Sequence, residues 1–127
     1  MEVIAQKTIL VIDDDYYICD VLKTCLEIFG GCKAITTLYA EEGLDIVAEN
    51  PPDAIVLDIL MPNMDGFAFL KKLQANPQIA DIPVVLLTAR ADLTDPQAIA
   101  KLGVNGAIAK PFHPVKLFSE ISQILGW

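Results

Sequence analysis

Short runs of β-branched and apolar residues alternate along this chain with segments of helical periodicity, and this alternation restricts the fold more than any other feature of the sequence. The strand-like runs cover residues 8–12, 33–37, 54–57, 83–87 and 107–109. The helix-like segments lie at residues 18–29, 40–48, 67–73, 95–102 and 114–125. Because successive parallel strands need a crossover, usually a helix, this pattern predicts an α/β fold with helices on both faces of a parallel sheet. We expect one domain over residues 1–127, because no repeat or linker interrupts the pattern.

Composition and charge limit the classes of function. The chain is 54% hydrophobic, enough for a buried core, and no apolar run approaches the roughly 20 residues of a membrane helix. Its opening residues lack the features of a signal peptide, so we expect a cytoplasmic location. A net charge of −8 with scattered basic residues argues against nucleic-acid or membrane binding and favours proteins or cations as partners. Cys19, Cys25 and Cys32 form no C-x-x-C motif, and we interpret them as reduced thiols.

Polar side chains follow most of the strand-like runs, at the point where each run ends. These residues are Asp13, Asp14, Asp58, Thr88 and Lys110. Because open α/β sheets bind ligands at the carboxyl ends of their strands, we expect these groups to converge at one edge of the sheet. Carboxylates in close contact repel by roughly 4 kcal/mol per pair at an effective dielectric constant near 20, so a cation has to neutralise them. We predict Mg²⁺, with Mn²⁺ as an alternative, and the backbone carbonyl of Leu60 as a further ligand.

Asp58 has two interpretations at this stage. Aspartate is common in turns, which would give Asp58 a purely structural role. Beside a cation, however, its carboxylate can attack phosphorus and hold the group as an aspartyl phosphate. Lys110 would then supply positive charge to one phosphoryl oxygen and the Thr88 hydroxyl would donate to another. Asp13 and Asp14 would hold the metal, Asp14 more directly.

Four motifs together resemble the receiver domain of bacterial two-component response regulators, including the single-domain chemotaxis type, from Ile9 to about Leu125. They read ILVIDDD at 9–15, LDILMPNMDG at 57–66, LTA at 87–89 and KPF at 110–112. The resemblance implies a flavodoxin-like, doubly wound sheet of five parallel strands in the order 2-1-3-4-5, with five helices. It also implies a cis bond between Lys110 and Pro111.

In function, the resemblance implies a phosphorelay receiver. A histidine kinase or phosphotransfer protein would donate a phosphoryl group to Asp58 in a Mg²⁺-dependent reaction, and the partner-binding surface would then change. A downstream protein partner and a monomer or weak homodimer belong to the same expectation. Such a domain is not an enzyme, beyond promoting its own phosphorylation and dephosphorylation.

The chain departs from the family at Ala107, where an aromatic residue commonly follows the movement of the threonine matched by Thr88. Another residue or segment would therefore have to transmit the conformational change to the surface formed by the fourth helix, fifth strand and fifth helix. One alternative function is therefore a docking module that has lost phosphorylation. Another is a phosphatase of the haloacid dehalogenase kind, which normally needs a second Asp two residues after its nucleophile, where this chain has Leu60. The sequence does not choose between a stand-alone receiver and a piece of a longer protein.

For several residues near the motifs we expect roles outside the metal and phosphoryl site or at its margin. We expect Asp15 to cap the first helix and His113 to face solvent or cap the last one. Tyr16 and Tyr17 flank the expected site, either as partly buried helix residues or as contacts for a kinase. Arg90 occupies a position that, in such domains, overhangs the phosphoryl group.

Overall fold

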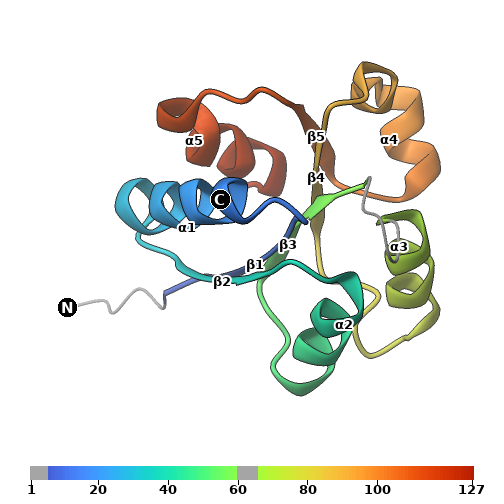
Figure 1. Ribbon diagram of the computed structural model, residues 1–127. Coiled ribbons are helices and arrows are strands. Elements are labelled where there is room, and N and C mark those ends of the chain that lie inside the picture. Colours follow the sequence, from blue (N-terminus) through green and yellow to red (C-terminus); the bar gives the residue numbers. More distant parts are fainter. Residues whose placement is uncertain (1–5, 60–65) are drawn as a thin grey trace.

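The fold is a single sheet covered by helices, in a computed structural model that describes residues 6–59 and 66–127 (Figure 1). Within these ranges all strands are parallel and lie in the order β2-β1-β3-β4-β5. The strands are β1 (Thr8–Ile12), β2 (Lys33–Thr37), β3 (Ala54–Asp58), β4 (Val84–Thr88) and β5 (Gly106–Ala109). The helices are α1 (Tyr16–Gly30), α2 (Ala40–Glu49), α3 (Gly66–Ala75), the 3₁₀ helix η1 (Ala91–Thr94), α4 (Pro96–Leu102) and α5 (Pro114–Leu125).

This architecture confirms the predicted α/β fold and the strand order that the resemblance implies. The observed strands differ from the predicted ones by only a residue at some ends. β3 includes Asp58, and β4 begins after Pro83, which has no backbone N–H to contribute to a strand. The connection between β4 and α4 contains η1.

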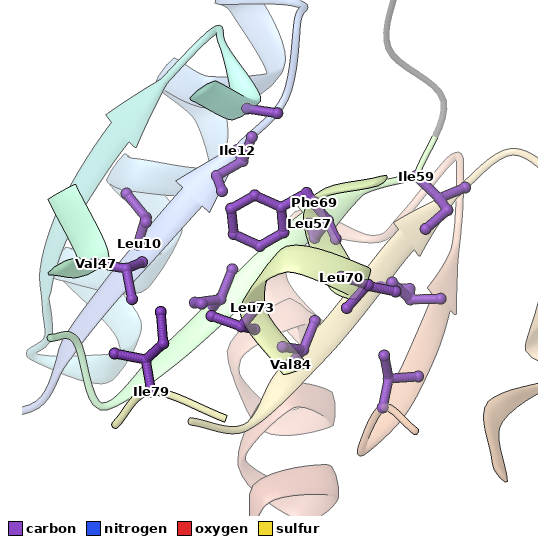
Figure 2. Close-up of a cluster of buried hydrophobic side chains, with 14 of the residues drawn as sticks. Leu10, Ile12, Val47, Leu57, Ile59, Phe69, Leu70, Leu73, Ile79 and Val84 are labelled. Atoms are coloured by element: carbon purple, nitrogen blue, oxygen red, sulfur yellow. The ribbon is translucent and has the colours of Figure 1, made fainter. Parts of the chain in front are cut away.

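The hydrophobic core has two halves, one on each face of the sheet. α1 and α5 cover one face, and α2, α3 and α4 cover the other (Figure 1). Because side chains alternate along a strand, Leu10 and Ile12 pack toward α3, whereas Ile9 and Val11 pack toward α1. Figure 2 shows the ring of Phe69 from α3 lying over β1 and β3, where it is fully buried. All five residues of β3 are buried, as its run of apolar residues predicts.

The ends of α1 follow from local sequence. Asp15 stands just before the helix, and its Oδ1 accepts the backbone N–H groups of Tyr17 at 2.9 Å and Ile18 at 3.3 Å, which confirms the predicted cap. The helix ends at Gly30, and Gly31 follows with φ of 63°, a left-handed conformation that favours glycine. At the start of α5, His113 is exposed and occupies the cap position without a side-chain capping bond.

All three cysteines are buried thiols without a disulfide bond, consistent with reduced side chains in the core. Among the described helices, none combines the length and the apolar character needed to cross a membrane.

Candidate functional site

Three carboxylates meet at the carboxyl ends of β1 and β3. Asp13 and Asp14 follow β1, and Asp58 is the last residue of β3. One carboxylate oxygen from each lies within 4.8 Å of those of the other two. Asp13 is 1% exposed and Asp58 is 6% exposed, whereas Asp14 faces solvent. The structure therefore brings together the three acidic residues that the sequence placed at strand ends, and it leaves the cluster accessible from the side of Asp14.

Lys110 joins this cluster from the end of β5. Its Nζ lies 2.7 Å from Oδ2 of Asp13 and 3.6 Å from Oδ2 of Asp58. Burial by itself would lower the pKa of Lys110, but the hydrogen bond and charge of Asp13, with the charge of Asp58, outweigh it and raise that pKa. Lys110 is therefore charged at neutral pH and offsets part of the acidic charge. The bond between Lys110 and Pro111 is cis, as the resemblance implies.

Thr88, at the end of β4, lies between the strands that carry Asp58 and Lys110. Its side chain is fully buried, and its backbone carbonyl accepts the N–H of Lys110 at 2.8 Å. Its hydroxyl oxygen accepts the N–H of Arg90 at 2.9 Å. A hydroxyl that accepts one hydrogen bond still carries a hydrogen to donate. Thr88 is thus fixed at the same edge of the sheet as the acidic cluster.

Asp13 lies in the loop between β1 and α1, where hydrogen bonds hold both its backbone and its side chain. The N–H of Asp13 donates to the carbonyl of Thr37 at 3.2 Å, and its Oδ1 accepts the N–H of Asp15 at 2.9 Å. The buried Sγ of Cys19 donates to the carbonyl of Asp13 at 3.3 Å. Burial, together with the negative charge of Asp13, raises the pKa of Cys19 to about 11, so the thiol keeps its proton at neutral pH.

Gly66 lets the start of α3 approach the end of β3. Its N–H donates to the carbonyl of Ile59 at 2.7 Å. A Cβ at this position would lie 2.5 Å from Cα of Ile59 and 2.9 Å from the carbonyl oxygen of Asp58, closer than real side chains come to backbone. Only glycine therefore allows α3 to begin beside Asp58 without displacing it. In the sequence, Gly66 stands only as the last residue of the motif at 57–66, and no local signal there indicates the close approach.

An apolar pocket of about 460 Å³ lies beside Lys110, between the start of α1 and the segment that joins β5 to α5. Its lining consists of Tyr17, Ile18, Val21, Ala89, Lys110, Pro111, Phe112 and Pro114. Tyr16 and Tyr17 are 65% and 78% exposed, so their interpretation as partly buried residues is wrong. Sequence reasoning missed the pocket, although Tyr17 and Val21 stand four residues apart on α1, a spacing that places them on one face of the helix.

Other residues of interest lie elsewhere or outside the described ranges. Ala107 is half-buried on β5 and packs against the core on the side of α3 and α4. Arg90 pairs with Asp92, with Nη2 2.7 Å from Oδ2. Leu60, the residue predicted to offer its backbone carbonyl to the metal, lies outside the residues that the structure describes.

The fold and the site together define a class: a flavodoxin-like domain with an acidic cluster, a lysine and a threonine at the carboxyl edge of its sheet. Residues 9–122 match the family model described as the response regulator receiver domain. The chain is 33% identical over 117 residues to the response regulator MprA of Mycobacterium sp. strain KMS, covering 92% of this chain and 50% of that protein.

Solved structures agree with this match. The N-terminal domain of a response regulator receiver protein from Methanoculleus marisnigri is 37% identical, with a TM-score of 0.76, and the match covers 97% of this chain and 99% of that one. The chemotaxis protein CheY4 of Vibrio cholerae is 28% identical, with a TM-score of 0.83, and the match covers 94% and 99% of the two chains. This chain belongs to the response regulator receiver domain family of two-component systems.

Membership of this family gives the general function. Receiver domains take part in phosphorelay signalling and interact with histidine kinases or phosphotransfer proteins and with downstream partners, and their fold is that of signalling proteins rather than of an enzyme family. The chain spans about half the length of several of the curated relatives it matches.

Proposed function

We propose that this chain accepts a phosphoryl group on Asp58 from a phosphohistidine of a histidine kinase or phosphotransfer protein, in a reaction that depends on Mg²⁺. The main support is the convergence of Asp13, Asp14 and Asp58 within 4.8 Å, with Lys110 3.6 Å from Asp58. The domain then presents a changed surface to a downstream protein, as a monomer or weak homodimer in the cytoplasm.

The donor set at this edge of the sheet fits a hard divalent cation. Three carboxylate oxygens in close proximity, one of them on a solvent-facing residue, match the preference of Mg²⁺ for oxygen ligands together with retained water. Asp13, Asp14 and Asp58 would hold the ion, with the carbonyl of Leu60 as a further ligand, and Mn²⁺ would fit the same ligands. When bound, the ion supplies positive charge to the oxygens of the incoming phosphoryl group.

The protein side chains perform the remaining steps. A carboxylate oxygen of Asp58 forms the new P–O bond while the P–N bond to the donor histidine breaks. The electron pair of that bond stays with the imidazole, which takes a proton from solvent and leaves as the neutral donor. Lys110 contributes its charge to one phosphoryl oxygen and the Thr88 hydroxyl donates to another. Lys110 already lies 3.6 Å from Asp58, and Thr88 ends the strand next to β3, so both groups start close to the reacting carboxylate.

The same contacts suggest how phosphorylation changes the surface. A phosphoryl group on Asp58 attracts Lys110, which otherwise lies closer to Asp13, and draws the Thr88 hydroxyl. Because Thr88 holds the N–H of Arg90 at 2.9 Å, its movement carries the segment from Ala89 through η1. Ala107 supplies no aromatic ring that could transmit this change, so we propose that the segment from Ala89 through η1 transmits it.

The apolar pocket beside Lys110 is where we expect the phosphate donor to dock. It adjoins the acidic site and is lined by exposed apolar side chains, of which Tyr17 is 78% exposed. A helix of the donor with apolar residues near its histidine would bury this surface as it brings phosphorus to Asp58.

Phosphorylation by a small donor tests this proposal directly. Wild-type protein incubated with acetyl phosphate and Mg²⁺ should gain the mass of one phosphoryl group, and Asp58→Asn should not. Asp45→Asn, which changes an exposed aspartate on α2, is the control and should behave like wild type.

Other outcomes would identify the alternatives. An equal mass gain in Asp58→Asn would show that another residue accepts the phosphoryl group. Turnover of small phosphate esters would indicate a phosphatase. If neither acetyl phosphate nor beryllofluoride with Mg²⁺ altered the wild-type protein, the docking module would be the better description.

A further inference from the structure

Cys19 connects the acidic site to the first turns of α1. Its side chain is buried, and its Sγ lies 3.3 Å from the carbonyl oxygen of Asp13 and 3.9 Å from that of Thr37. The thiol therefore reaches both the residue that follows β1 and the last residue of β2.

These contacts complete the support of the Asp13 backbone. Its N–H donates to Thr37 at 3.2 Å, and its carbonyl accepts the thiol hydrogen of Cys19. Both backbone groups of Asp13 are thus tied to neighbouring elements, one to the edge strand and one to α1. The direction of a short side chain is set by its own backbone, and Asp13 has only two side-chain torsions left to adjust.

We propose that Cys19 is a positioning residue for the cation site: its thiol fixes the orientation of Asp13 and thereby the affinity for Mg²⁺. This inference rests on the proposed function, in which Asp13 helps to hold the ion. The proposed role needs no contact between Cys19 and the ion or the phosphoryl group, because the thiol acts through the backbone of Asp13.

Cys25 provides a matched control on the same helix. It is buried like Cys19, belongs to the same half of the core, and has no side-chain hydrogen bond within residues 6–59 and 66–127. Replacing either cysteine with alanine removes one sulfur atom from the same half of the core. Only the replacement of Cys19 also removes the hydrogen bond to Asp13.

The experiment compares Cys19→Ala, Cys19→Ser and Cys25→Ala with wild type, all under reducing conditions. Three quantities are measured: urea unfolding, Mg²⁺ affinity by calorimetry without a phosphate donor, and hydrogen exchange of the Asp13 amide in metal-free protein. Both alanine variants should lose stability. Only Cys19→Ala should bind Mg²⁺ about fivefold more weakly, and only in this variant should the Asp13 amide exchange faster than the change in global stability explains. Cys19→Ser keeps a hydrogen-bond donor and should recover much of the Mg²⁺ affinity and of the amide protection.

Unchanged Mg²⁺ affinity and unchanged amide protection in folded Cys19→Ala would overturn the proposal, as would equal effects in Cys25→Ala. If Cys19→Ala does not fold, Cys19→Val fills the space without a donor and takes its place. If wild type bound no Mg²⁺, the proposed function would fail at its metal site. Amide exchange would then still decide whether Cys19 orders Asp13, so the two failures are distinguishable.

Discussion

Lys110 lies nearer to Asp13 than to Asp58, at 2.7 Å against 3.6 Å, and Asp13 is the more deeply buried of the two. A buried carboxylate without a partner is costly, so the lysine first compensates Asp13. Asp14 is exposed and pairs with no lysine among residues 6–59 and 66–127, so in metal-free protein it adds repulsion to the cluster. Asp13 and Asp14 therefore affect the stability of the metal-free protein differently, because the charge of Asp13 is compensated by Lys110 whereas that of Asp14 adds repulsion.

At this scale we predict opposite effects of Asp14→Asn in the absence and presence of metal. The variant should raise the free energy of unfolding by about 1 kcal/mol in metal-free buffer, because it relieves carboxylate repulsion. It should also lose most of the stabilisation that Mg²⁺ gives to wild type. Urea unfolding with and without Mg²⁺ measures both effects. Asp20→Asn makes the same charge change at an exposed position on α1, outside the cluster, and should do neither. A clear loss of metal-free stability in Asp14→Asn would contradict a repulsive cluster.

At the scale of elements, the start of α1 serves both the helix and the site. Asp15 caps the helix with its side chain, while its N–H donates to Asp13. The cap thus lies one residue from Asp14 but directs its carboxylate at the helix N–H groups of Tyr17 and Ile18. Asp15 stabilises the element that positions the site without belonging to the metal cluster.

We therefore predict that Asp15→Ala lowers the free energy of unfolding by about 1 kcal/mol, the usual cost of losing a helix cap. Its affinity for Mg²⁺ should stay close to that of wild type, because alanine keeps the N–H that supports Asp13. Asp15→Ser should recover most of the lost stability. Urea unfolding and calorimetric Mg²⁺ titration test the two parts, and a loss of affinity as large as that of Asp14→Asn would show that Asp15 is a ligand.

At the scale of the whole molecule, the sheet order places β1, β3, β4 and β5 side by side, so residues far apart in sequence share one edge. The same compact packing buries three thiols. Burial raises the pKa of Cys25 and Cys32, and burial together with Asp13 raises the pKa of Cys19 to about 11 from an ordinary 9.0. The folded state therefore binds these protons more tightly than the unfolded chain does.

This difference predicts that stability falls in alkaline solution. Below pH 9 both states keep the thiol protons, but as the pH rises from 9 to 11 the unfolded chain loses them first, which favours unfolding. Cys19 alone should account for a decline of about 2 kcal/mol over this interval. Urea unfolding of reduced protein at pH 8 and 10.5 measures the decline, and Cys19→Ser should make it shallower. Equal unfolding free energies at the two pH values in wild type would contradict the prediction.

Much of the fold and part of the site could be predicted from local sequence. The apolar run before Asp58 indicated a strand covered on both faces, and all of β3 is buried. Asp15 before the first helical segment indicated a cap, because the signal lies within three residues. Asp13, Asp58, Thr88 and Lys110 each follow a predicted strand, and parallel strands present their carboxyl ends at the same edge.

The sequence by itself determined the alternation of strands and helices, and it determined that the polar residues stand at the carboxyl edge of the sheet. Both features depend on neighbours along the chain. The strand order came from resemblance, not from the pattern. Only the tertiary structure decided that Lys110 favours Asp13, that the Cys19 thiol supports the Asp13 backbone, and that Gly66 passes too close to Ile59 for any side chain. These features depend on distances between elements, and such distances are fixed only when the two halves of the core are packed against the sheet.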